Sequence, residues 1–157
     1  MRIVIILLAS LLSFASLCMA APVGAPYAKL NKSKYIVTTD ASFMLSRGTG
    51  ATYNLNYELR KTFPQEIYGL VTFDNPASPG APFEVEVTVP AGETQIYVQS
   101  PGIHLLQNNH SYQVVLTLYD DATHTQSLSE HKQAVVFSYS ARQLAELEEK
   151  FDLQITL

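Results

Sequence analysis

The sequence predicts an all-β antiparallel sandwich of about seven strands, followed by one short helix. Apolar and polar residues alternate over seven segments, a period typical of strands with one buried face. Turn-forming pairs such as Asn75-Pro76 and Pro101-Gly102 fall between these segments. No helical period interrupts the run before Ser140, whereas parallel strands need crossovers of a dozen or more residues, usually helical. An antiparallel sandwich is therefore favoured, with a closed barrel as the lesser alternative.

The strands follow from the alternation taken segment by segment. The clearest case covers residues 52–60, where Tyr53, Leu55, Tyr57 and Leu59 alternate with polar neighbours. The expected strands are 35–39, 52–60, 67–73, 83–89, 95–99, 112–118 and 133–139.

The end of the chain changes to a helical period. Ser140 is a good helix cap, and Gln143 three residues later completes a capping-box pattern. Leu144, Leu147 and Phe151 then share one face, so a helix is expected over 141–152. Apolar residues alternate again over 153–157 and indicate a short final strand. The apolar stripe has two interpretations: it covers an open end or edge of its own sandwich, or it docks a partner.

The first 20 residues have the features of an export signal. Met1-Arg2 gives a positive start, an apolar stretch of about 15 residues follows, and small residues at Cys18 and Ala20 fit a cleavage site. A membrane anchor is disfavoured because spanning a bilayer takes about 20 apolar residues. A lipid anchor at Cys18 is disfavoured by Leu17, which stands where such signals need a small residue. The mature domain is therefore expected to be secreted or periplasmic.

The predicted division is a signal peptide over 1–20, a flexible segment over 21–33, a sandwich over 34–139 and a C-terminal helix and strand over 140–157. The chain has 157 residues, of which 47% are hydrophobic and 15% charged, a composition that excludes disorder. Its net charge is −4, the wrong sign for a non-specific nucleic-acid binder. Cys18 is the only cysteine, so the mature chain has no disulfide and no thiolate chemistry.

One stretch has a familiar pattern. Leu106 stands six residues before Tyr112, and Tyr112 opens an alternating strand. This arrangement resembles the tyrosine corner of immunoglobulin-like and fibronectin-type-III-like sandwiches, in which the tyrosine hydroxyl bonds to backbone just upstream. The resemblance implies an immunoglobulin-like sandwich and carries no particular activity. The chain departs from antibody domains because it has no tryptophan and no pair of cysteines between the sheets.

Candidate catalytic and metal-binding groups are sparse. Nucleophile elbows, metalloprotease motifs and phosphate-binding glycine loops are all missing from the sequence. Glu84 and Glu86 share one strand face and are expected to keep that strand soluble. The group of Asp120, Asp121, His124 and His131, placed on an expected loop over 121–130, matches no closed metal motif. The sequence predicts no enzyme, no metal and no cofactor.

Three tyrosines, Tyr68, Tyr97 and Tyr119, lie out of phase with the apolar series of their strands. Two interpretations stay open for them. They are scattered amphipathic surface residues, or they form an aromatic patch on an outer sheet face that contacts sugar or protein.

Recognition is the function that the sequence favours. Loops 61–65, 90–93 and 121–130 are expected at one end of the sandwich, where variable domains carry their binding loops. The candidate contact residues are Phe63, Asp121, His124 and Thr125. The expected partner is a protein or a glycan, with no nucleic acid and no stable membrane insertion. The alternatives are a structural subunit of an envelope or surface assembly, joined by strand addition or by its helix, and a small secreted enzyme.

Overall fold

The computed structural model describes residues 33–157 of the chain. Its all-β architecture with one C-terminal helix confirms the predicted fold class. The elements in chain order are β1 (Ile36–Ser46), β2 (Gly50–Leu59), β3 (Ile67–Phe73), β4 (Phe83–Val89), β5 (Gln95–Gln99), β6 (Leu105–Gln107), β7 (His110–Tyr119), β8 (Ser127–Phe137), α1 (Ala141–Phe151) and β9 (Gln154–Thr156).

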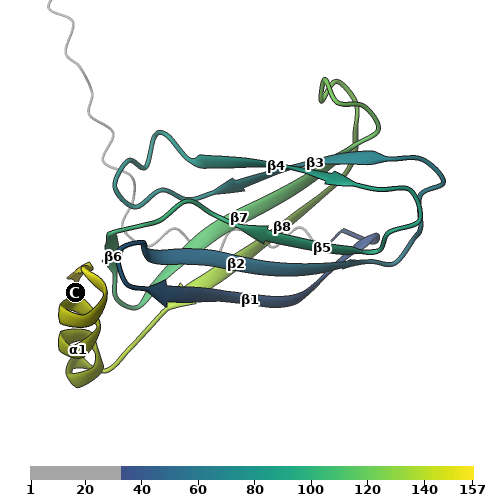
Figure 1. The fold of residues 1–157 in the computed structure, drawn as a ribbon. Helices are drawn as coiled ribbons and strands as arrows, with labels where there is room; N and C mark the ends of the chain where they lie inside the picture. The colour runs from purple at the N-terminus through teal and green to yellow at the C-terminus, as the bar shows by residue number, and fades with distance from the viewer. Residues whose placement is uncertain (1–32) are drawn as a thin grey trace, which may run out of the picture.

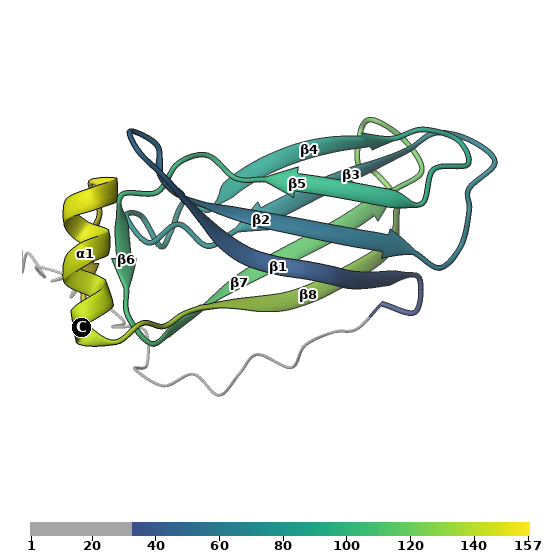
Figure 2. The same cartoon turned by 60° about the horizontal axis from the view of Figure 1, so that its bottom comes forward.

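Two antiparallel sheets lie face to face in a sandwich-like arrangement (Figures 1 and 2). One sheet has the order β1-β2-β5, and the other has the order β4-β3-β7-β8. A third, two-stranded sheet pairs β6 with β9 in parallel, next to α1. The predicted signal peptide over 1–20, and nearly all of the segment 21–33, lie outside the described residues. Within residues 33–157, no helix is long and apolar enough to cross a membrane.

The core forms where the predicted apolar faces meet. Tyr53 and Leu55 of β2 are fully buried, as are Val114 and Leu116 of β7 on the opposing sheet. Alternating apolar residues therefore turn inward together, as the period-2 pattern predicts. Val85 and Val87 of β4 are only half-buried, because β4 is an edge strand with a neighbour on one side.

The prediction of a long hairpin loop over residues 121–130 was wrong. The loop between β7 and β8 covers only residues 120–126, because Ser127, Ser129 and Glu130 already pair with β7. These residues are polar and do not alternate with apolar ones, so the sequence pattern did not predict the first part of this strand. Likewise β1 extends to Ser46, well past the expected end at residue 39, with an irregularity in its pairing between Thr38 and Asp40.

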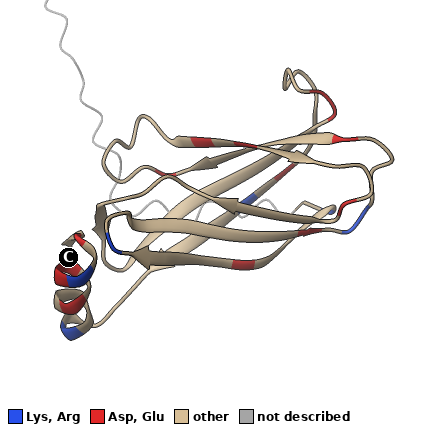
Figure 3. Cartoon of the chain, viewed as in Figure 1, with Lys and Arg blue, Asp and Glu red and all other residues tan. Residues whose placement is uncertain are grey.

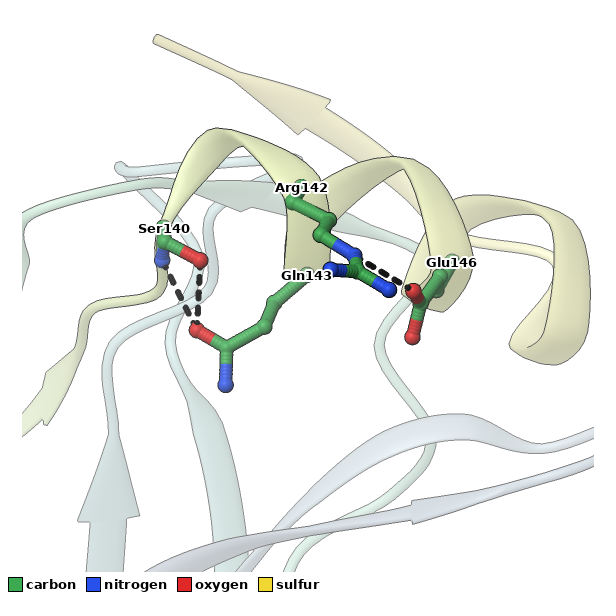
Figure 4. A network of polar contacts seen from close by, with 4 residues as sticks. All are labelled: Ser140, Arg142, Gln143 and Glu146. Atoms are coloured by element: carbon green, nitrogen blue, oxygen red, sulfur yellow. Dashed lines mark hydrogen bonds and ion pairs between the residues drawn. The ribbon is translucent and has the colours of Figure 1, made fainter.

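The C-terminal helix forms where its cap predicts. The backbone N–H and the hydroxyl of Ser140 both donate to Oε1 of Gln143, at 3.0 and 2.8 Å (Figure 4). On the solvent side, Arg142 Nε lies 3.6 Å from an oxygen of Glu146. Leu144 is buried, and with Leu153 it belongs to the same core as the sheets. The helix thus covers one end of its own sandwich.

Candidate functional site

Three loops meet at the end of the sandwich opposite α1 (Figures 1 and 2). They join β2 to β3, β4 to β5, and β7 to β8. The first two are tied together, because the N–H of Gly92 donates to the carbonyl of Phe63 at 2.9 Å. The loops expected at one end do lie there, since each follows a strand that runs away from the helix.

The β7–β8 loop is organised around one carboxylate. Asp121 accepts hydrogen bonds from the backbone N–H of Thr123 at 2.7 Å and from the hydroxyl of Thr125 at 2.8 Å. The hydroxyl of Thr123 donates to the same carboxylate. These bonds from Thr123 and Thr125 favour the charged form and hold the pKa of Asp121 well below its usual value. The loop therefore has a defined shape although it is a surface connection.

His124 connects this loop to the outer face of the four-stranded sheet. Its backbone is left-handed, with a φ of 56°, a conformation uncommon for residues other than glycine. Its ring lies 4.6 Å from the ring of Tyr119, measured between centroids. Tyr119 is paired across the ladder with Tyr68, whose hydroxyl donates to Glu66 at 2.7 Å. Tyr119 and His124 are thus in ring contact beside the Asp121 turn, and with Tyr68, the cross-strand neighbour of Tyr119, they form what we call the aromatic strip.

Phe63 is the predicted contact residue that stands apart. It is half-buried on the β2–β3 loop, and the ammonium of Lys61 lies 5.2 Å from the centre of its ring. The same ammonium lies 5.6 Å from the ring of Tyr35. Within residues 33–157, no hydrogen bond, ion pair or ring contact joins Phe63 to Asp121, His124 or Thr125. The structure brings three of the four predicted residues together and leaves Phe63 on a neighbouring loop.

The proposed aromatic patch is divided between the two sheets. Tyr68 and Tyr119 are cross-strand neighbours on the four-stranded sheet, whereas Tyr97 lies on β5 of the three-stranded sheet. His131, placed on a loop by the sequence, is instead buried in β8. Its Nε2 lies 2.9 Å from the hydroxyl of Thr38, and its Nδ1 accepts the N–H of Ser33 at 3.3 Å.

The other titratable candidates are dispersed. His104 lies near α1, with Nδ1 3.1 Å from the carbonyl oxygen of Asp152, at the end opposite His124. Glu84 and Glu86 are exposed on the edge strand β4, without a resolved partner. In the part of the chain that the structure describes, no group of three His, Cys, Asp or Glu residues is arranged to hold a metal ion.

The fold and the site together define an all-β sandwich-like domain with an ordered hairpin loop at one end. No family model matches the chain, and no curated protein matches it either. Among solved structures it is similar to the crystal structure of Bacteroides uniformis beta-glucuronidase, with 20% sequence identity and a TM-score of 0.41. That similarity covers 66% of this chain and 13% of the other chain.

Proposed function

We propose that the chain is an exported, non-enzymatic recognition module that binds a protein or glycan partner through the β7–β8 loop. The observation that supports this most is the junction between the Asp121 turn and the aromatic strip of Tyr68, Tyr119 and His124. Export rests on the signal-like sequence of residues 1–20, which places the module outside the cytosol, secreted or periplasmic.

A loop that is ordered before binding loses less conformational entropy on binding than a flexible loop does. Three hydrogen bonds to Asp121 already order residues 121–125, so a partner does not have to fix this backbone on binding. Aromatic side chains lose little conformational entropy and are enriched where binding energy concentrates. The strip supplies such side chains on the adjoining sheet face. The loop and the strip together make one surface with polar and apolar parts.

The finer architecture that we propose is immunoglobulin-like or fibronectin-type-III-like. Two features support it: the hydrogen bond from the Gln107 N–H to the Tyr112 hydroxyl, at 2.7 Å, and the division of seven strands into sheets of three and four. In variable domains of this architecture the binding loops gather at one end of the sandwich. The β7–β8 loop of this chain lies at such an end.

Recognition is favoured over a role as an assembly subunit because the elements suited to joining a neighbour are occupied within the chain. α1 buries Leu144 against its own sandwich, and β9 pairs with β6 through residues 105–107. Pairing of β9 with a neighbour in place of β6, or docking of α1 through its buried face, would first have to break those contacts.

The test uses the full chain as bait in extracts of its source cells. Residues 120–126 are replaced by Asn-Gly, a two-residue turn suited to joining β7 and β8. A second variant, His124→Gly, removes the imidazole and keeps the left-handed backbone without strain. Both should lose the partner that the unaltered chain captures, while Glu149→Ala on α1, at the other end, should keep it. Equal capture by all four chains would reject the proposal.

A further inference from the structure

The outer surface of the three-stranded sheet has only two charged side chains on its strands, Asp40 and Glu58, and both lie toward one end. Six outward side chains of β1, β2 and β5 lie together on this surface, and we call this group the neutral face. Its members are Ser42, Met44, Thr52, Asn54, Tyr97 and Gln99. Asp40 and Glu58 border it on the side of the binding loops. Figure 3 shows this sheet mostly tan, in contrast to the charged helix α1.

A hydrogen-bond network holds the neutral face in one arrangement. The hydroxyl of Tyr97 donates to Oδ1 of Asn54 at 2.6 Å, across from β5 to β2. Nδ2 of Asn54 donates in turn to Thr52 Oγ1 at 3.0 Å, and Nε2 of Gln99 donates to the same oxygen at 3.1 Å. Thr52 and Asn54 are only 3% and 7% exposed although they point away from the core. Thr52 and Asn54 therefore lie within the sheet surface, covered by side chains of the edge strand β5.

Tyr97 is the exposed member of this network. Its side chain reaches diagonally over β2, because Tyr97 is in register with Asn56 but is bonded to Asn54. The residue is nevertheless 58% exposed, one of the largest values for an apolar side chain among the described residues. With its hydroxyl fixed, the ring lies over the sheet and offers solvent an aromatic surface that is already ordered. Single exposed aromatic rings are common on protein surfaces, and what distinguishes Tyr97 is the bond to Asn54 that holds its ring in place.

We propose that the neutral face binds an uncharged oligosaccharide, with one sugar ring placed on Tyr97. An ordered aromatic ring beside amide and hydroxyl groups can pack against the face of a sugar ring while those groups bond its hydroxyls. The exposed amide of Gln99, which gives one N–H to Thr52, and the hydroxyl of Ser42, which donates to Asp40 at 3.4 Å, can still accept hydrogen bonds from sugar hydroxyls. A neutral ligand is favoured over an acidic one because the charged groups that border the face, Asp40 and Glu58, are both carboxylates.

This site is separate from the proposed partner-binding loop, because it lies on the other sheet and shares no residue with the aromatic strip. A protein partner is less suited to it. Protein interfaces concentrate their binding energy in a buried apolar or aromatic centre, and here Met44 and Tyr97 alone supply large apolar groups. The hydroxyl and amide groups that make up the remainder suit a polyhydroxylated ligand better.

The test is affinity electrophoresis of the full chain in gels that contain a neutral glucan, xylan, mannan or galactan, with polygalacturonate as the acidic comparison. We expect at least one neutral polysaccharide to retard the chain. Tyr97→Ala should weaken that retardation about tenfold, which is the effect of losing a central aromatic contact. Tyr97→Phe, which keeps the ring but frees Asn54, should lose less than Tyr97→Ala. Val136→Ala, at a similarly exposed apolar side chain on β8 of the opposite sheet, is the matched control and should bind as the unaltered chain does.

The proposal is overturned if no neutral polysaccharide retards the chain, or if Tyr97→Ala binds as strongly as the unaltered chain. Retardation by polygalacturonate alone also overturns it. So does a dimer that Tyr97→Ala dissociates, seen by light scattering, because a second copy would then occupy the face. Replacing residues 120–126 should leave the retardation unchanged, so that this inference and the proposed function fail independently. Circular dichroism of each variant checks that it is folded.

Discussion

The hydroxyl oxygen of Tyr112 accepts a hydrogen bond from the backbone N–H of Gln107 at 2.7 Å, across the connection from β6 to β7. The next residue, Asn108, extends this anchor in two directions. Its N–H donates to the carbonyl of Thr156 in β9 at 2.7 Å, and its side chain bonds both backbone groups of Tyr139. The corner therefore joins the sandwich to the segment that leads into the helix and to the final strand.

Tyr112→Phe should loosen this corner. The variant keeps the buried ring but leaves the Gln107 N–H without its acceptor, which costs about 1–2 kcal/mol of unfolding free energy. Urea denaturation followed by circular dichroism measures the loss, and amide exchange should quicken at residues 105–109 and in β9. Unchanged exchange in β9 would show that the corner does not support the C-terminal segment.

The alternation of the sequence was enough to predict the core but not the connections around it. Spacing alone predicts the burial of Tyr53, Leu55, Val114 and Leu116, because a strand presents every second residue to one face. The pairing of β6 with β9 gave no such signal. Each has three residues, and the partners lie about 50 positions apart, so their association depends on where the whole sandwich places them.

The candidate site was predictable from the sequence only where its contacts are local. Asp121, Thr123 and Thr125 form a local turn that short-range sequence can encode, and their roles follow from hydrogen bonds within five residues. The neutral face, in contrast, depends on how distant strands are aligned with one another. Asn54 and Tyr97 are 43 residues apart and meet only because β2 pairs with β5 in one alignment. Sequence reasoning treated Tyr97 as a companion of Tyr68 and missed the network beneath it.

Tyr53 and Tyr57 provide a matched pair, since both are fully buried on the same face of β2. The hydroxyl of Tyr53 donates to the carbonyl of Asp74 at 2.9 Å, whereas that of Tyr57 has no hydrogen-bond partner among the described residues. Tyr53→Phe should therefore cost about 1 kcal/mol, while Tyr57→Phe should be neutral or stabilise by up to about 1 kcal/mol. Chemical denaturation of the two variants side by side measures both. Equal losses would mean that the Tyr57 hydroxyl is satisfied.

The same two tyrosines should make the fold sensitive to alkali. Burial raises the pKa of both phenols well above 10, more strongly than any other cause, with the Asp74 charge adding to the effect at Tyr53. A raised pKa stabilises the fold fully below the unfolded value near 10, and that stability is lost as the pH rises further. After a jump to pH 12, phenolate absorbance at 295 nm should show a slow phase that coincides with unfolding by circular dichroism. The double variant Tyr53→Phe/Tyr57→Phe should lose much of the amplitude of this phase, with buried Tyr112 supplying the remainder. A fully fast absorbance change in a folded chain would contradict the burial of these phenols.

Acid should affect the β7–β8 loop only at very low pH. Because the folded pKa of Asp121 is held down by the bonds from Thr123 and Thr125, the turn is fully stabilised above the ordinary value near 4 and opens as the pH falls below it. The carboxyl carbon shift of Asp121, which reports its own protonation, should stay constant from pH 7 to pH 4 and move only at lower pH, and the amide shifts of Thr123 and Thr125 should move with it there. Asp121→Ala should show the open-loop shifts at neutral pH with an unchanged melting temperature, since the turn is local. A midpoint at or above pH 4 in the unaltered chain would contradict the observed bonding.

The helix should stabilise the end of the sandwich mainly through Leu144. This side chain is only 5% exposed, whereas Glu149 on the same helix is exposed. Leu144→Ala removes buried methyl groups and leaves a cavity between α1 and the core, which should cost about 2–3 kcal/mol. Glu149→Ala, the matched control, should change the unfolding free energy by less than about 0.5 kcal/mol. If denaturation shows equal stability for both variants, α1 is not part of the cooperative core, and the C-terminal helix becomes available to a partner after all.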